Sequence, residues 1–153
     1  MNKDLLKHIG ESTAYSAKGH FKTADIRRIA TYLYITLNFA FSIVCLTNLV
    51  NIFWLQILSV ISLFASVLLL ISETHGGLSI CKEHTKYANL YLELHNDTYT
   101  EFLNPYTTQQ NLEELKDRFN SLNKKERPNI NIGGKFWAKF AIEKMKEMNV
   151  WWK

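Results

Sequence analysis

Two long apolar runs dominate the order of hydrophobic and polar positions in this chain. No Asp, Glu, Lys or Arg occurs among the 44 residues between Arg28 and Glu73. The more polar residues 47–51 separate an apolar run over residues 32–46 from a second run over residues 52–71. A helix rises 1.5 Å per residue and crosses the hydrocarbon core of a bilayer in about 20 residues. The sequence therefore predicts a two-helix transmembrane hairpin over residues 29–72.

A buried helical hairpin in a soluble bundle is the alternative to a membrane hairpin. A helix at the edge of a soluble core normally keeps one polar stripe, whereas here no charge occurs on any face. A cleaved signal peptide also fits poorly, because the apolar stretch begins roughly 30 residues into the chain and is too long for such a peptide. We therefore expect the bilayer to cover these residues.

The segments on either side of the hairpin have helical spacing. Residues 1–28 carry a weak amphipathic pattern that Gly10 and Gly19 interrupt, which predicts one or two short helices in a cytoplasmic or interfacial segment. Residues 73–153 predict a cytoplasmic helical region. With no strand pattern in the chain, the expected fold class is all-α: a transmembrane helical hairpin with N-terminal and C-terminal cytoplasmic helices.

Three helices are expected within residues 73–153. The first resumes at Leu78 after the glycines at positions 76 and 77, and Asn96-Asp97 are expected to end it. Thr107-x-x-Gln110 is a capping-box pattern, and it precedes a second helix. Leucines and Phe119 form the stripe of that helix, at positions 112, 115, 119 and 122.

The third of these helices is expected from about Lys135 and combines lysines with aromatic residues as far as Trp151 and Trp152. Such a composition suits the membrane surface. It equally suits packing of the Trp and Met residues into a cytoplasmic bundle. We favour packing, because the leucine stripe of the preceding helix needs a partner.

Charge predicts the orientation of the hairpin. Residues 1–28 hold six basic and three acidic residues, and Lys22, Arg27 and Arg28 stand closest to the first span. The turn between the spans has no charge, whereas residues 73–153 are close to neutral with 12 basic and 11 acidic residues. Because basic residues favour the cytoplasmic side, both termini are expected in the cytoplasm, with two spans in the membrane. Interfacial anchoring is expected from the basic residues above and from three aromatic ones, Tyr32, Tyr34 and Trp54.

Polar residues inside the predicted spans are the candidate functional positions. On the first span they share one face at i, i+4 and i+7, and they are Asn38, Ser42 and Cys45. On the second span three serines do the same, with a glutamine one turn earlier: Ser59, Ser62, Ser66 and Gln56. Polar groups in hydrocarbon need partners. Two interpretations stay open, namely close helix packing and the wall of a polar pore built by several hairpins.

The remaining candidate chemistry is sparse. None of the five histidines forms an i, i+4 pair typical of a helical metal site, and there is no Cys-x-x-Cys motif. Gly133-Gly134-Lys135 lacks the other residues of a phosphate-binding loop. No nucleophile has an obvious base, and no basic patch interleaved with aromatic residues favours nucleic acid beyond the C-terminal segment. The sequence therefore predicts neither an enzyme nor a cofactor, a metal or a nucleic-acid partner.

At the level of the whole chain the sequence resembles the SLATT domain, a prokaryotic two-transmembrane family associated with antiviral conflict systems. The resemblance rests on four parts, in order: the basic lead-in over residues 21–28, the tight hairpin, the pattern His84-x-x-x-Ala88-x-x-Tyr91-x-x-Leu94, and the segment 112–123 followed by Pro128 and a closing helix. The glycines at positions 76 and 77 and the aromatic C-terminal segment depart from the family pattern.

The resemblance implies an oligomeric pore-forming or membrane-disrupting effector of the bacterial inner (plasma) membrane, acting in antiviral defence by abortive infection. Its expected partners are the lipid bilayer, further copies of the chain, and a trigger that is a cyclic nucleotide or a sensor protein. No catalytic residue set is carried over from the family. Two other classes stay open: a membrane-anchored adaptor that recruits a soluble partner through residues 73–153, and a nucleotide sensor that forms no pore.

Overall fold

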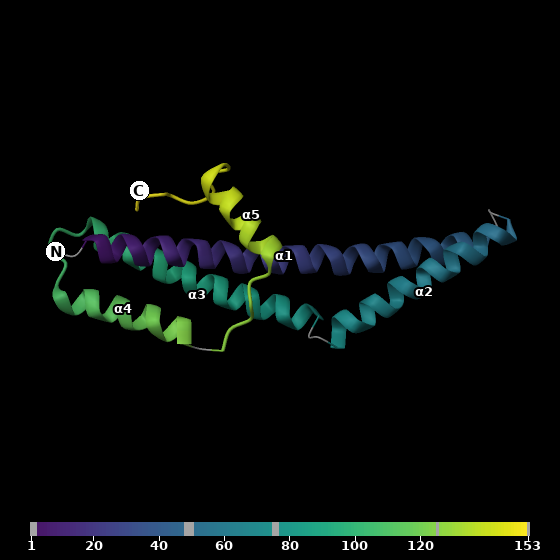
Figure 1. Cartoon of the computed structure of the whole chain (residues 1–153), viewed down its shortest axis with the longest axis horizontal. Coiled ribbons are helices and arrows are strands. Elements are labelled where there is room, and N and C mark those ends of the chain that lie inside the picture. The colour runs from purple at the N-terminus through teal and green to yellow at the C-terminus, as the bar shows by residue number, and fades with distance from the viewer. Residues whose placement is uncertain (1–2, 48–50, 75–76, 125, 153) are drawn as a thin grey trace. The chain divides into compact units, whose positions relative to one another are not determined.

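The computed structural model describes the chain apart from residues 1–2, 48–50, 75–76, 125 and 153. Within that part of the chain every regular element is a helix, which confirms the all-α class. Figure 1 shows the helices in chain order: α1 (Lys3–Thr47), α2 (Ile52–Thr74), α3 (Gly77–Leu103), α4 (Gln109–Lys124) and α5 (Ile132–Glu143). The predicted turn between the spans and the glycine break before α3 fall largely on residues 48–50 and 75–76, which lie outside the described residues.

Helix α1 runs without a break through Gly10 and Gly19, so the prediction of short, interrupted N-terminal helices is wrong. Both glycines are sites of close packing. A Cβ atom at Gly10 would overlap the indole ring of Trp151, and one at Gly19 would stand 2.9 Å from the Cδ1 atom of Ile130. Tertiary contacts therefore account for residues that look like helix breakers in the sequence.

Helix α3 also continues past its predicted end at Asn96-Asp97. The hydroxyl of Thr98 donates to the carbonyl of Leu94 at 2.6 Å, and that of Thr100 donates to the carbonyl of Asn96 at 3.0 Å. These hydroxyls bond back to the preceding turn instead of capping a new one. The helix ends at Leu103, shortly before Pro105, which cannot continue it.

The cap of α4 lies one residue later than the sequence predicts. Thr108 Oγ1 accepts a hydrogen bond from the backbone N–H of Asn111 at 3.2 Å, as an N-cap does. Thr107 instead donates to the carbonyls of Glu101 and Asn104, which closes the turn after α3. The predicted leucine stripe is confirmed as the inward face of α4, with three buried members: Leu112, Leu115 and Leu122.

Helix α5 is shorter than expected. It begins at Ile132, where the side chain of Asn131 caps the N–H of Gly134, and it ends at Glu143. Lys146, with a φ of 53°, lies in the left-handed region that an α-helix does not use. Residues 144–152 consequently pack as a non-helical segment that places Trp152 in the interior.

The chain divides into two compact units, which are described separately. The bundle unit comprises Met1–Ala24 and Lys82–Lys153, and the hairpin unit comprises Asp25–Cys81. The core of the bundle unit joins α1, α3 and α4 through seven buried residues: Leu6, Ala17, Tyr91, Leu94, Leu112, Leu115 and Leu122. A second cluster joins α1, α5 and the C-terminal segment through Ala14, Ile142 and Trp152.

The hairpin unit has almost no interior of its own. Helices α1 and α2 are each long and apolar enough to cross a membrane, and only 6% of the most apolar window in each is buried. Large apolar side chains stand exposed along both, such as Phe39, Leu46 and Phe64 at 68%, 82% and 67%. The core helix of a soluble bundle would bury these side chains. The two helices therefore fit a two-span membrane protein.

Candidate functional site

The two polar stripes of the hairpin unit lie on facing sides of α1 and α2. Asn38 Oδ1 accepts hydrogen bonds from Ser62 Oγ at 2.7 Å and from Ser66 Oγ at 3.3 Å. Residues 24 and 28 positions apart in the chain are thus joined by a single amide oxygen. Hydrogen bonds of this kind hold helices together in hydrocarbon, and each stabilises the helix pair by roughly 0.6–2 kcal/mol.

Other polar members of the stripes bond to their own helix. Ser42 Oγ donates to the carbonyl of Asn38 at 2.8 Å, and Ser59 Oγ donates to the carbonyl of Leu55 at 2.8 Å. Their hydroxyls are therefore satisfied without a second helix. Together with Cys45 and five neighbours they line a groove along the hairpin: Phe41, Ser42, Cys45, Leu46, Ser59, Ser62, Leu63 and Ser66.

Gln56 stands apart from this groove. Its side chain is exposed, and it is not among the residues that line the groove. Nearby, Asn51 Oδ1 accepts from the backbone N–H of Trp54 at 3.1 Å and so caps the start of α2. Trp54 is 53% exposed at this end of the helix.

The expected interface anchors differ in their surroundings. Tyr32 and Arg28 are exposed, whereas Tyr34 and Arg27 are half-buried. Lys22 lies in the bundle unit, where its ammonium group pairs with Glu147 at 3.4 Å. Lys22 therefore contributes to the position of the C-terminal segment, a role that charge counting along the sequence does not reveal.

A buried pair of histidines lies inside the bundle unit. His20 Nδ1 on α1 and His84 Nδ1 on α3 are 2.8 Å apart, and both side chains are inaccessible to solvent. The His20 ring stacks on Tyr87 and Tyr91, with ring centroids 5.9 and 5.8 Å away. Burial, then the neighbouring His84, then the charge of Arg127 lower the pKa of His20 to about 4. Sequence spacing missed this pair because its members are 64 positions apart.

A third histidine fastens the C-terminal segment. His95 Nδ1 contacts the carbonyl of Gly10 at 2.9 Å, and Trp151 Nε1 donates to His95 Nε2 at 3.3 Å. A neutral ring that carries its hydrogen on Nδ1 satisfies both contacts. Burial lowers the pKa of His95, which favours that neutral form.

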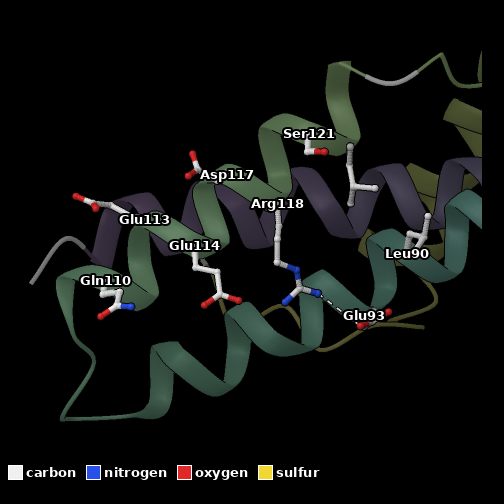
Figure 2. A pocket seen from close by; sticks show the side chains of 9 residues that line it. Leu90, Glu93, Gln110, Glu113, Glu114, Asp117, Arg118 and Ser121 are labelled. Atoms are coloured by element: carbon white, nitrogen blue, oxygen red, sulfur yellow. Dashed lines mark ion pairs between the residues drawn. The ribbon is translucent and has the colours of Figure 1, made fainter.

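A groove of the bundle unit lies between α3 and α4 and is lined mainly by acidic residues. Figure 2 shows Arg118 extending from α4 toward Glu93 on α3, and the two form an ion pair of 3.5 Å. Arg118 also pairs with Asp97 at 2.7 Å. Three further carboxylates line the groove, from Glu113, Glu114 and Asp117. This excess of negative charge does not suit a phosphate group, because like charges repel.

Among the residues that the structure describes, no three His, Cys, Asp or Glu side chains gather where they could hold a metal ion. Comparison with known proteins adds no relative: no family model, no curated protein and no solved structure matches the chain.

Proposed function

We propose that this chain is a two-span protein of the bacterial inner membrane that assembles through its hairpin and permeabilises that membrane as an effector of antiviral defence. The bundle unit holds the hairpin inactive until a signal releases it. Insertion is supported by the length, composition and exposure of α1 and α2. The cytoplasmic position of both termini is supported by the basic residues before the first span.

The groove of the hairpin unit carries the proposal of assembly. Asn38 Oδ1 already accepts from Ser62 and Ser66, so one hairpin satisfies this amide oxygen by itself. The adjoining groove contains the small side chains Ser42, Cys45 and Ser59, bordered by the larger Phe41, Leu46 and Leu63. Small residues let a further helix approach closely in a bilayer. Two helices alone cannot enclose water, so permeation requires several hairpins.

The assignment to antiviral defence is supported by the resemblance to the SLATT domain. It is also compatible with the small size of the chain and with the lack of a catalytic constellation in its sequence. Under this proposal the trigger acts on the bundle unit.

A membrane-anchored adaptor is the second candidate function, and the acidic groove between α3 and α4 favours it. Glu93, Glu113, Glu114 and Asp117 line this groove together with a single arginine, Arg118, which pairs with Glu93. A basic protein segment complements this surface, whereas the phosphate of a cyclic nucleotide does not. In an adaptor a pull-down gives one stoichiometric basic partner and the cells show no ion leak.

Membrane potential and dye entry in bacteria at low, titrated expression test the pore. One variant replaces three polar residues of the groove by alanine, with Ser42→Ala, Cys45→Ala and Ser59→Ala. The control is Thr36→Val, an exposed position of α1 outside the groove. Wild type and control are expected to depolarise the membrane, and the groove variant is expected to leak less at equal membrane abundance.

A leak that is equal in all three proteins would contradict a pore lined by this groove. Silence of the wild type, even when the infection signal is supplied, together with a stoichiometric partner in the pull-down, would favour the adaptor.

A further inference from the structure

Helix α5 has two faces of opposite character. One face consists of small or aliphatic residues that are buried against the rest of the bundle unit: Gly134, Ala138, Ala141 and Ile142. The other face is apolar but exposed. Ile132, Phe136 and Phe140 follow i, i+4 and i+8, and they are 87%, 65% and 40% exposed.

The exposed face is continued by Trp137, at 47%, and by Met145, at 57%, just beyond the helix. The expectation that the aromatic residues of this region pack inward therefore holds for Trp151 and Trp152 but is wrong for these residues of α5. A contiguous group of large exposed apolar side chains on a folded unit is characteristic of an interaction site.

Lysines border this apolar face. Lys135 and Lys139 stand beside it on α5, and Lys144 and Lys146 follow just after the end of the helix, all exposed. Among the described residues none of the four forms an ion pair.

The two acidic groups of the same region have other partners. Glu143 Oε1 accepts from the hydroxyl of Tyr15 at 3.0 Å. Glu147 pairs with Lys18 at 2.8 Å and with Lys22 at 3.4 Å. Because Tyr15 is neutral, Glu143 keeps its negative charge, and the four lysines against this one carboxylate leave the border of the apolar face with a net positive charge.

The start of α5 is held firmly on α1. Gly134 leaves no room for a Cβ atom between Thr23 Oγ1 and the carbonyl of Gly19, and Thr23 Oγ1 also contacts Asn131 Oδ1 at 3.3 Å. In the chain, Thr23 precedes Arg27 by four residues, and the uncharged stretch begins two residues after Arg27. The exposed face thus belongs to a helix that is fixed on the lead-in to the proposed first span.

We propose that the exposed face of α5 binds the anionic headgroup surface of the membrane. Its aromatic and aliphatic side chains enter the boundary between headgroups and acyl chains, and its lysines contact lipid phosphates. Charge complementarity selects this occupant, because a bilayer with anionic lipid offers both phosphates and an apolar layer. The inference rests on the proposed insertion of the hairpin, which anchors the same chain in a membrane.

Photo-crosslinking of the full chain in vesicles tests this binding. Phe136 is replaced by p-benzoylphenylalanine, which keeps an aromatic group on the face, and adducts are identified by mass spectrometry. Tyr106, 86% exposed in the bundle unit, is the matched control position. Phe64, 67% exposed on α2, reports insertion of the hairpin independently. The vesicles contain phosphatidylcholine with or without phosphatidylglycerol.

Lipid adducts are expected at Phe136 and Phe64 but not at Tyr106, and those at Phe136 should increase with phosphatidylglycerol. Lys135→Gln and Lys139→Gln, introduced singly, should each lower the docked population about fivefold, since each removes one positive charge and a lysine near an anionic surface contributes that much to binding. The yield at Phe64 should stay unchanged.

Lipid adducts at Phe64 but none at Phe136 would overturn the inference and leave the proposed function intact. A crosslink from Phe136 to a second copy would overturn it in favour of a protein interface. No lipid adduct at Phe64 would instead contradict the proposed function, and adducts at Phe136 alone would then retain α5 as a peripheral lipid-binding helix.

Discussion

His20 and His84 meet inside the bundle unit with their Nδ1 atoms 2.8 Å apart. One of the two nitrogens must carry the hydrogen and the other must accept it, so the contact is made by two neutral rings in different tautomers. The groups that face the pair are Tyr87, Tyr91 and the cationic Arg127. None of them offers a negative charge to a protonated imidazole.

Acid is therefore expected to destabilise the bundle unit. The pKa of His20 is about 4 in the folded chain and near 6.5 when unfolded, so the unfolded state binds more protons between these values. The contribution of His20 to the free energy of unfolding is fully present above about pH 6.5. It is lost as the pH drops toward 4, by about 3 kcal/mol in total. His95, whose pKa is also lowered, adds to this loss of stability at low pH.

Thermal unfolding of the detergent-solubilised protein from pH 7.5 to pH 4.5 measures this loss. His20→Gln should flatten the dependence, whereas His8→Gln, at an exposed site, should leave it as in the wild type. A wild-type midpoint that is constant over this range would contradict the expected effect of the pair.

Gly10→Ala is expected to destabilise the protein, although a glycine inside a helix is ordinarily improved by alanine. The added methyl group overlaps the ring of Trp151, which overpacks the site by about 1–3 kcal/mol. Limited proteolysis of the C-terminal segment should accelerate accordingly. Gly19→Ala is the milder control, because it meets the flexible end of Ile130. Rescue of Gly10→Ala by Trp151→Leu would show that the overlap is the cause, and failure of the rescue would argue against it.

The effects of Asn38→Leu and Ser62→Ala on the stability of the hairpin are expected to be non-additive. A double-mutant cycle on hairpin stability in detergent should give an interaction of about 0.6–1.7 kcal/mol, since their hydrogen bond of 2.7 Å crosses between α1 and α2. Gln56→Leu paired with Ser62→Ala serves as the comparison, because Gln56 is exposed away from the groove. Strict additivity for Asn38 and Ser62 would mean that the contact does not hold the helices together.

Glu147→Gln is expected to loosen the C-terminal segment. Hydrogen bonding to Lys18 is the main cause that lowers the pKa of Glu147, so its carboxylate is charged above about pH 4.5 and its ion pairs contribute there. Because the groups are only partly buried, the loss should be about 1 kcal/mol or less, and it should shrink in high salt. The measurement is the rate of proteolytic cleavage after residue 143 with and without salt. A concentration of about 0.5–1 M is enough to screen exposed ion pairs. Glu113→Gln, an exposed carboxylate of α4, is the control, and an equal change in both would rule out a specific role for the Lys18 pair.

Local patterns predicted much of the fold. The uncharged run between Arg28 and Glu73 has the length of two membrane spans, and the leucine stripe of α4 has the period of a helix. Both patterns depend only on neighbours in the chain. The polar stripes on α1 and α2 were also visible as periodic positions. That Asn38 binds Ser62 and Ser66, while Gln56 stands apart, depended on the register of the two helices.

What the sequence alone determined was the all-α class, the two apolar helices and the positions of the polar stripes, because hydrophobic periodicity and chain length act locally. Tertiary structure decided that α1 runs through Gly10 and Gly19, where Trp151 and Ile130 occupy the space that a side chain would fill. It also brought His20 to His84 and turned Phe136 outward while Trp152 became buried. Such outcomes depend on which faces meet across long chain separations, and packing of the whole molecule, not any local pattern, selects those contacts.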